Sequence, residues 1–251
     1  MRIVISIFLA LLIFSCGNNN KPKVTVAVSN NMQYAMEEIV VAFEKQHAVR
    51  VELSASSSGT LTTQIKQGAP FDIFISANMK YPNTLFEEGL AMEAPKVYAN
   101  GSLVLWTLNG KDISEGMKSL LSDDFKKIAI ANPETAPYGI AAVEAMKKVN
   151  LYDDLNPKLI WGEGIGQVNQ YIKSKSVDAG ITSKSVLFSK KISTKGNHIE
   201  IDKSLYKPIH QGIVLLKSGK EKNLKNAELF YNFMFSKETK SILTKFGYEV
   251  K

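Results

Sequence analysis

Residues 49–77 read VRVELSASSSGTLTTQIKQGAPFDIFISA. The segment 49–53 alternates between apolar and polar residues, which predicts a half-buried strand, and FDIFI at 71–75 predicts a buried one. Between them, residues 60–67 predict a short helix, which follows a turn rich in Ser and Gly. We therefore expect this stretch to form a strand, a helix and a second strand in succession.

The same alternation of strand and helix patterns continues on both sides of this unit. Strands are expected at 23–28, 97–99, 102–107, 128–131, 158–161, 179–182, 198–201 and 212–216, and helices at 32–46, 83–89, 140–149, 167–175, 185–187, 225–235 and 237–246. This order predicts an α/β fold in which mostly parallel sheets are flanked by helices.

The length of 251 residues exceeds the commonest domain size and favours two lobes. We expect the chain to cross between them near 100–102 and near 207–212. Residues 23–100 plus 208–251 would then form lobe 1, and residues 101–207 would form lobe 2. Two crossings would leave a cleft between the lobes.

The first residues have the features of an export signal. Met1 and Arg2 precede an apolar run that ends at Ser15-Cys16 and is too short to span a membrane well. The box Ile13-Phe14-Ser15-Cys16 resembles the Leu-x-[Ala/Gly/Ser]-Cys box of bacterial lipoproteins. We expect residues 1–15 to be removed, Cys16 to be lipidated and 16–22 to form a polar linker. The protein would be periplasmic or at the cell surface, anchored to a membrane.

The composition excludes several classes of protein. The formal charge is +7, from 31 Lys and Arg against 24 Asp and Glu, yet only Arg2 and Arg50 are arginines. Nucleic-acid binding is therefore not expected, because arginine is the preferred residue for reading phosphates and bases. One Cys and three widely spaced His (His47, His198 and His210) predict no disulfide framework, no metal-cation site and no bound cofactor.

Polar turns follow four of the expected strands, at 29–31, 54–60, 131–139 and 163–166. Each precedes an expected helix, so each brings unpaired backbone amides and the positive end of a helix dipole. Ligands of open α/β sheets bind at the carboxyl ends of strands. If the four turns converge, they would form a neutral, donor-rich anion site.

Residues 57–77 resemble the periplasmic molybdate-binding proteins of ABC importers, whose pattern is close to S-S-[SG]-T-L-x-x-Q-I-x-x-G-A-P-A-D-[LV]-F-I-S-A. Weaker matches lie at 27–29, 132–139, 162–165 and 178–181, and the similarity spans 24–247. The resemblance implies the two-lobed type II periplasmic-binding fold. It also implies a monomeric receptor for molybdate and tungstate, rather than an enzyme, that delivers the ion to a permease.

The resemblance also implies the binding residues. Ser29 and Ser58 would each give a hydroxyl and an amide, and Tyr138 and Ile165 would give amides at positions where the family has Ala and Val. Ser183 stands at the family's Tyr donor, and its shorter side chain would bind through water or not at all. The Tyr138 hydroxyl could compensate for that loss. We expect Asp72 to brace the turn at 57–60.

Three alternatives stay open at this point. A serine hydrolase would need a Ser–His pair, and the sequence has no G-x-S-x-G elbow. A ferric-ion receptor would need clustered Tyr with His or Asp, for which only Tyr206 and His210 lie close in sequence. A receptor for another oxyanion, such as sulfate or a small organic anion, fits the same features of the turns.

Overall fold

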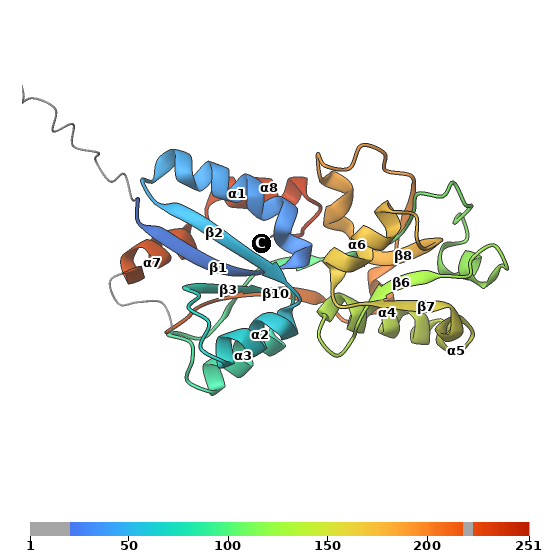
Figure 1. Ribbon diagram of the computed structural model, residues 1–251, viewed down its shortest axis with the longest axis horizontal. Helices are drawn as coiled ribbons and strands as arrows, with labels where there is room; N and C mark the ends of the chain where they lie inside the picture. Colours follow the sequence, from blue (N-terminus) through green and yellow to red (C-terminus); the bar gives the residue numbers. More distant parts are fainter. Residues whose placement is uncertain (1–20, 218–222, 251) are drawn as a thin grey trace, which may run out of the picture.

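The structure is a computed structural model that describes residues 21–217 and 223–250. Figure 1 shows two lobes, each with helices packed around a sheet. The predicted signal peptide at 1–15 and the predicted lipidation site Cys16 lie outside the described residues. Among the residues that are described, no helix is long and apolar enough to cross a membrane.

The first sheet has five strands in the order β2-β1-β3-β10-β4. The strands are β1 (Lys23–Ser29), β2 (Arg50–Ser56), β3 (Ile73–Ser76), β4 (Lys96–Gly101) and β10 (Ile209–Leu215). Its helices are α1 (Gln33–Gln46), α2 (Ser58–Lys66), α3 (Lys80–Glu87), α7 (Leu224–Phe233) and α8 (Lys237–Lys245), with a 3-10 turn η1 (Asn30–Met32) before α1.

The second sheet also has five strands, in the order β7-β6-β8-β5-β9. The strands are β5 (Leu103–Thr107), β6 (Ile128–Ala131), β7 (Leu159–Gly162), β8 (Ala179–Ser183) and β9 (Asn197–Glu200). Its helices are α4 (Pro137–Lys148), α5 (Tyr152–Leu155) and α6 (Ile165–Lys173), with 3-10 turns η2 (Gly116–Leu121), η3 (Asn156–Lys158), η4 (Lys184–Phe188) and η5 (Lys203–Leu205).

Both sheets are mixed in the same way. In the first, β1 pairs in parallel with β2 and β3, while β10 runs antiparallel to β3 and β4. In the second, β6 pairs in parallel with β7 and β8, while β5 runs antiparallel to β8 and β9. The chain enters the second sheet through β5 and returns to the first through β10. The strand that runs antiparallel to its neighbours in each sheet is therefore the first one after the chain has crossed between the sheets. These crossings support, as a proposal, the division into lobe 1 (23–100 with 208–251) and lobe 2 (101–207).

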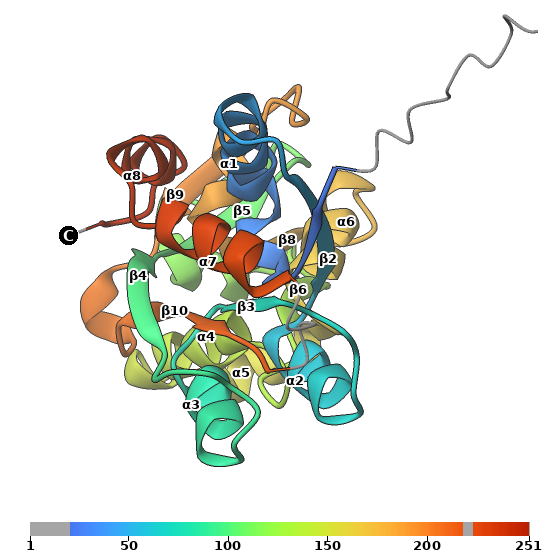
Figure 2. The ribbon, with the colours of Figure 1, turned by 90° about the vertical axis from the view of Figure 1, so that its left-hand side faces the viewer.

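The alternation of side chains along the strands of lobe 1 explains its two layers of helices. Val26, Val28 and Ile75 belong to the core that contains residues of α1, α7 and α8. Ala27 and Phe74, one position along, belong to the core on the opposite face, with residues of α2 and α3. Figure 2 shows these two groups of helices on opposite sides of the first sheet.

In lobe 2 the central strands are buried on both faces. Every residue of β5, β6 and β8 is buried, and α4 and α6 both contact β6 and β8. Such strands are expected as near-continuous apolar runs, and LVLWT and IAIA fit this pattern.

One expectation about the first lobe is wrong. Asp72 does not brace the turn at 57–60; its carboxylate accepts the Thr25 amide at 2.6 Å and the Thr25 hydroxyl at 2.9 Å. The turn supplies its own cap instead, because the Ser57 hydroxyl accepts the Thr60 amide. Asp72 therefore ties β1 to the start of β3, away from the cleft.

Candidate anion-binding site

The four polar turns meet around one cavity of about 10 Å³ between the lobes. Ser29, Asn30, Asn31, Ser57, Ser58 and Ala77 line it from lobe 1, and Ala136, Pro137, Tyr138 and Ile165 line it from lobe 2. All ten of these lining residues are uncharged. The cavity is far smaller than the 300–1,000 Å³ usual for organic ligands, so its size favours a small ion.

Two serine hydroxyls and one backbone amide form the centre of the lobe 1 wall. The Oγ atoms of Ser29 and Ser58 lie 2.5 Å apart. The amide of Ala77 donates to both, at 3.1 Å and 3.0 Å. Because this N–H occupies a lone pair on each oxygen, both hydroxyls can turn their hydrogens outward as donors, although in this structure one of them donates to the other. Both serines are buried, at 2% and 1% exposure, so an anion would meet them without competing bulk water.

Helix starts supply the remaining donors. Ser58 is the first residue of α2, behind the capping residue Ser57. In lobe 2, α4 starts at Pro137, which has no N–H, so Tyr138 carries the first amide of that helix, and Ile165 carries the first amide of α6. Amides of a first helical turn have no acceptor within the helix and lie at the positive end of its dipole. These backbone groups can therefore bind an anion without any charged side chain.

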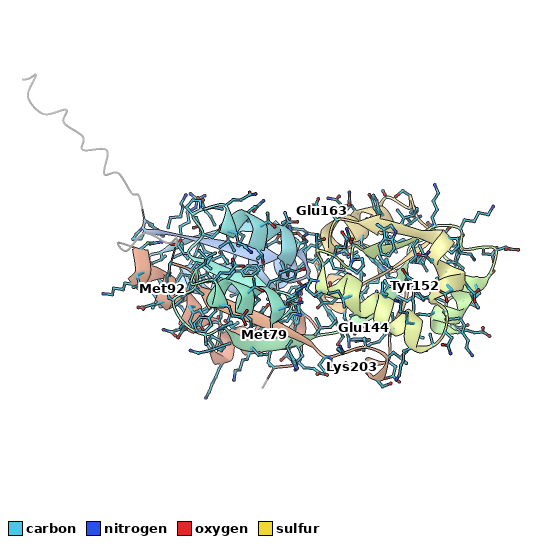
Figure 3. All side chains as sticks on the ribbon, turned by 90° about the horizontal axis from the view of Figure 1, so that it is seen from below. Met79, Met92, Glu144, Tyr152, Glu163 and Lys203 are labelled. Atoms are coloured by element: carbon cyan, nitrogen blue, oxygen red, sulfur yellow. The ribbon has the colours of Figure 1, made fainter. Side chains whose placement is uncertain are left out.

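Direct hydrogen bonds hold the two lobes together around the cavity. The Gly59 amide donates to Thr135 O at 2.9 Å, and the Tyr81 hydroxyl donates to Glu134 O at 3.2 Å. Glu163, which lies at the boundary between the lobes in Figure 3, accepts a bond from Thr60 at 3.4 Å. The cleft is therefore closed.

Glycines make this close approach possible. A Cβ atom at Gly59 would lie 2.9 Å from Thr135 Cα, and one at Gly164 or Gly166 would lie 3.2 Å or 3.1 Å from the Asn30 side chain. At Gly59 the neighbour is backbone, so packing between the lobes requires glycine there, whereas at Gly164 and Gly166 the nearest atoms belong to side chains and the fit is only tight. None of the three has a positive φ.

The predicted residues fall into two groups. Ser29, Ser58, Tyr138 and Ile165 all line the cavity, and Ser183 does not. Ser183 is buried at the end of β8, and its hydroxyl lies 3.0 Å from that of Ser185. Ser183 therefore reaches the site only through neighbouring residues.

The Tyr138 side chain is directed away from the cavity. Its hydroxyl lies against Gly101, a residue that does not line the cavity. Burial, together with nearby tyrosines, raises the pKa of Tyr138 well above its ordinary value, and burial raises the pKa of Tyr248 to about 12. Both phenols therefore stay protonated near neutral pH.

Several residues at or behind the site were missed from the sequence. Asn30 and Asn31 stand in the turn after β1 and could have been named from that position. Ala77 ends the family pattern at 57–77, but nothing in that pattern indicates that its backbone amide bonds to Ser29 and Ser58. Gln211 and Tyr248 are brought to the site only by contacts over long sequence distances.

The two residues named for a ferric-ion receptor are engaged elsewhere. The Tyr206 hydroxyl accepts the Leu103 amide, and His210 Nδ1 lies 2.6 Å from Asn100 Oδ1. Among the described residues, no three His, Cys, Asp or Glu side chains gather to hold a metal ion.

A cavity walled by neutral donors between two α/β lobes defines a solute-binding protein with the type II periplasmic-binding fold. The chain belongs to the family described as bacterial extracellular solute-binding proteins, whose match covers residues 24–249. The predictions of a two-lobed fold and of a binding protein rather than an enzyme are thus confirmed.

Individual relatives cover nearly all of the described chain. The molybdate-binding protein ModA of Rhodobacter capsulatus is 35% identical over 227 residues, covering 90% of this chain and 88% of that protein. The structure of the Azotobacter vinelandii periplasmic molybdate-binding protein matches with a TM-score of 0.83 at 30% identity, covering 91% of this chain and 99% of that one. YvgL of Bacillus subtilis, described as an ABC transporter substrate-binding lipoprotein, is 29% identical over 259 residues, 97% of each chain. The resemblance seen in the sequence is therefore confirmed.

Proposed function

We propose that this protein is a receptor for molybdate, and for the nearly isosteric tungstate, that delivers the ion to an ABC import permease. The observation that carries this proposal is the cavity itself, where two serine hydroxyls oriented by the Ala77 amide face the starts of α4 and α6. The names of the relatives point to the same ligand.

The chemistry of the wall suits a fully deprotonated tetrahedral dianion. Molybdate accepts hydrogen bonds and donates none at neutral pH, which matches a wall of N–H and O–H donors. Hydrogen bonds to a charged group contribute roughly 1.5–3 kcal/mol each, so several of them support micromolar or tighter binding. Phosphate keeps a proton near neutral pH that needs an acceptor, and sulfate is the smaller ion.

The donor set that we propose has contributions from both lobes. Ser29 and Ser58 would give hydroxyls and amides, and Tyr138 and Ile165 would give amides. For the remaining donor we favour the amide of Asn30, the first residue of η1, because Asn30 lines the cavity and Ser183 does not.

We further propose that Cys16 is lipidated and anchors the receptor to a membrane face, with the binding lobes acting as a monomer outside the cytoplasm. A lipoprotein relative and the extracellular family support this proposal. Metabolic labelling with a fatty acid should label the wild type and leave Cys16→Ser unlabelled. Equal labelling of the two proteins would contradict lipidation at Cys16.

Isothermal titration of the purified protein with molybdate, tungstate, sulfate and phosphate tests the ligand. We expect tight one-to-one binding of molybdate and tungstate, with sulfate and phosphate at least about 100-fold weaker, which corresponds to about 2.7 kcal/mol. Tight sulfate binding with weak molybdate binding would reassign the receptor to sulfate. If none of the four ions binds, the cavity serves a different anion.

A further inference from the structure

Behind the cavity, a series of buried hydrogen bonds runs from lobe 2 into lobe 1. The Ser185 hydroxyl of lobe 2 donates to Asn31 O of lobe 1 at 2.7 Å. The Tyr248 hydroxyl donates to Asn31 O at 2.7 Å and accepts Asn31 Nδ2 at 3.0 Å. Asn31 Nδ2 also donates to Gln211 Oε1 at 2.8 Å. Tyr248 and Gln211 do not line the cavity, although both bond to a residue that does.

The series continues to the two serines. Gln211 Nε2 donates to Ala77 O at 3.3 Å. The amide of the same residue, Ala77, donates to the hydroxyls of Ser29 and Ser58. A displacement of Gln211 would therefore shift Ala77, whose amide orients both hydroxyls.

The residues of this series are buried and bonded to one another. Ser185, Tyr248, Asn31 and Gln211 are each at most 4% exposed. Gln211 Nε2 makes a second bond, to Ile209 O at 3.3 Å. Hydrogen bonds between buried groups favour one arrangement, because a buried group that loses its partner is costly.

Tyr138 and Tyr248 belong to separate cores, Tyr138 to the core of lobe 2 and Tyr248 to a core of lobe 1. Gly101 is the last residue of β4, where the chain leaves the first sheet, and a Cβ atom there would clash with the Tyr138 hydroxyl. The glycine thus admits the phenol of Tyr138 to the crossing. The bond from Ser185 to Asn31 crosses between the lobes and exists only with the lobes in this arrangement.

We propose that Tyr248 is a positioning residue for the anion site. Its hydroxyl fixes Asn31 in the turn after β1, where the Asn31 carbonyl also accepts the Ser185 hydroxyl of lobe 2, and so holds the Ser29 donors at the spacing of the closed cleft. The inference rests on the proposed function, because the affinity for an oxyanion is the quantity that Tyr248 would set.

The test compares Tyr248→Phe with a matched control, Tyr98→Phe. Tyr98 lies in the same lobe 1 core and is 5% exposed, but its buried hydroxyl has no hydrogen-bond partner. Its removal should therefore have no effect on binding. We expect Tyr248→Phe to bind molybdate about tenfold more weakly, as for the loss of one buried hydrogen bond, through faster dissociation. Isothermal titration measures the affinity, and stopped-flow fluorescence measures the dissociation rate.

Ser185→Ala and the double variant Ser185→Ala/Tyr248→Phe supply a second measurement, which stands even if one variant folds poorly. We expect Ser185→Ala to weaken binding by a similar factor and the double variant to lose less than the sum of the two single losses, because both hydroxyls donate to Asn31 O. Purely additive losses would overturn the proposal.

The remaining outcomes separate this inference from the proposed function. Wild-type affinity in Tyr248→Phe, or an equal loss in Tyr98→Phe, would overturn the positioning role and leave the molybdate assignment intact. If the wild type binds neither molybdate nor tungstate, the proposed function and this inference fall together. A lower melting temperature of Tyr248→Phe with unchanged molybdate dissociation would assign its hydroxyl to stability and also overturn the proposal.

Discussion

The two lobes present different chemistry to the same cavity. Lobe 1 contributes polar side chains, among them Ser29 and Ser58, whose hydroxyls face each other. Lobe 2 contributes the starts of two helices, where Tyr138 and Ile165 carry the first amides. The comparison teaches that a binding site can depend on residue identity on one side and on backbone geometry on the other. It also explains how Tyr138 can stand where the molybdate-binding family has Ala, because lobe 2 uses the backbone amide at this position.

The largest expected effect comes from removing the lobe 1 hydroxyls. Ser29→Ala/Ser58→Ala should lower molybdate affinity by about 100-fold or more, because two bonds to a charged ligand are lost. Isothermal titration measures the change. Ser54→Ala, an exposed serine of β2, is the matched control and should bind as the wild type does. Wild-type affinity in the double variant would remove lobe 1 side chains from the binding site.

The next effect tests the contact between the lobes. In Gly59→Ala the new Cβ would meet the Thr135 backbone, so closure should be impaired and affinity should fall by about tenfold. Gly59 lies in α2, where Ala is the better helix former by about 1 kcal/mol, so the melting temperature of the free protein should hold or rise.

Gly166→Ala is a milder substitution at the same boundary and serves as the control for Gly59→Ala. Its new Cβ would meet the end of the Asn30 side chain, which can move, so the loss of affinity should be smaller. Isothermal titration measures the affinity of each variant, and thermal unfolding measures its melting temperature. If Gly59→Ala lowered both affinity and melting temperature, damage to the fold rather than to closure would be indicated.

A change of side chain in lobe 2 should affect stability rather than binding. Ile165 is 4% exposed and packs in the lobe 2 core, so Ile165→Val should destabilise the protein by about 1 kcal/mol. Its amide is retained, so molybdate affinity should change less than about threefold, which is under 1 kcal/mol. Chemical denaturation and titration provide the measurements. A loss of molybdate affinity as large as that caused by Ser58→Ala would contradict the view that lobe 1 binds through side chains and lobe 2 through backbone amides.

The smallest effect concerns acid stability away from the cavity. Burial raises the pKa of Asp178, but hydrogen bonds from Lys111 and from the Lys127 and Lys126 amides outweigh it, and the pKa is lowered. A lowered folded-state pKa gives stability that is present above the unfolded value of about 3.9 and lost as the pH falls through the folded value. The melting temperatures of wild type and Asp178→Asn should therefore differ at pH 7 and converge in acid. Asp123→Asn, at an exposed site, should track the wild type throughout.

Much of the fold could be predicted from periodicity. The strand expected at 128–131 is β6, and the strand expected at 23–28 is β1, which runs one residue further. The helices at the cavity begin earlier than expected, at Ser58, Pro137 and Ile165. Periodic apolar residues report the buried face of a helix, whereas Ser, Gly and Pro in its first turn carry no such pattern. The starts of α3 and β10 are also three residues earlier than expected, so the boundary errors are not confined to the cavity. The 3-10 turn at 116–121 and the short helix α5 were not predicted at all.

The sequence by itself determined which strands end in polar turns, that these turns start helices, and that Ser29 and Ser58 are candidate donors. Only the tertiary structure decided that the Ala77 amide orients both hydroxyls, that Ser183 lies off the cavity, and that Tyr248 meets Asn31 from the other end of the chain. The physical reason is the sequence distance between the residues that determine each feature. Helix starts and strand faces follow from neighbouring residues, whereas the partner of a buried hydroxyl depends on how separate lobes close on each other.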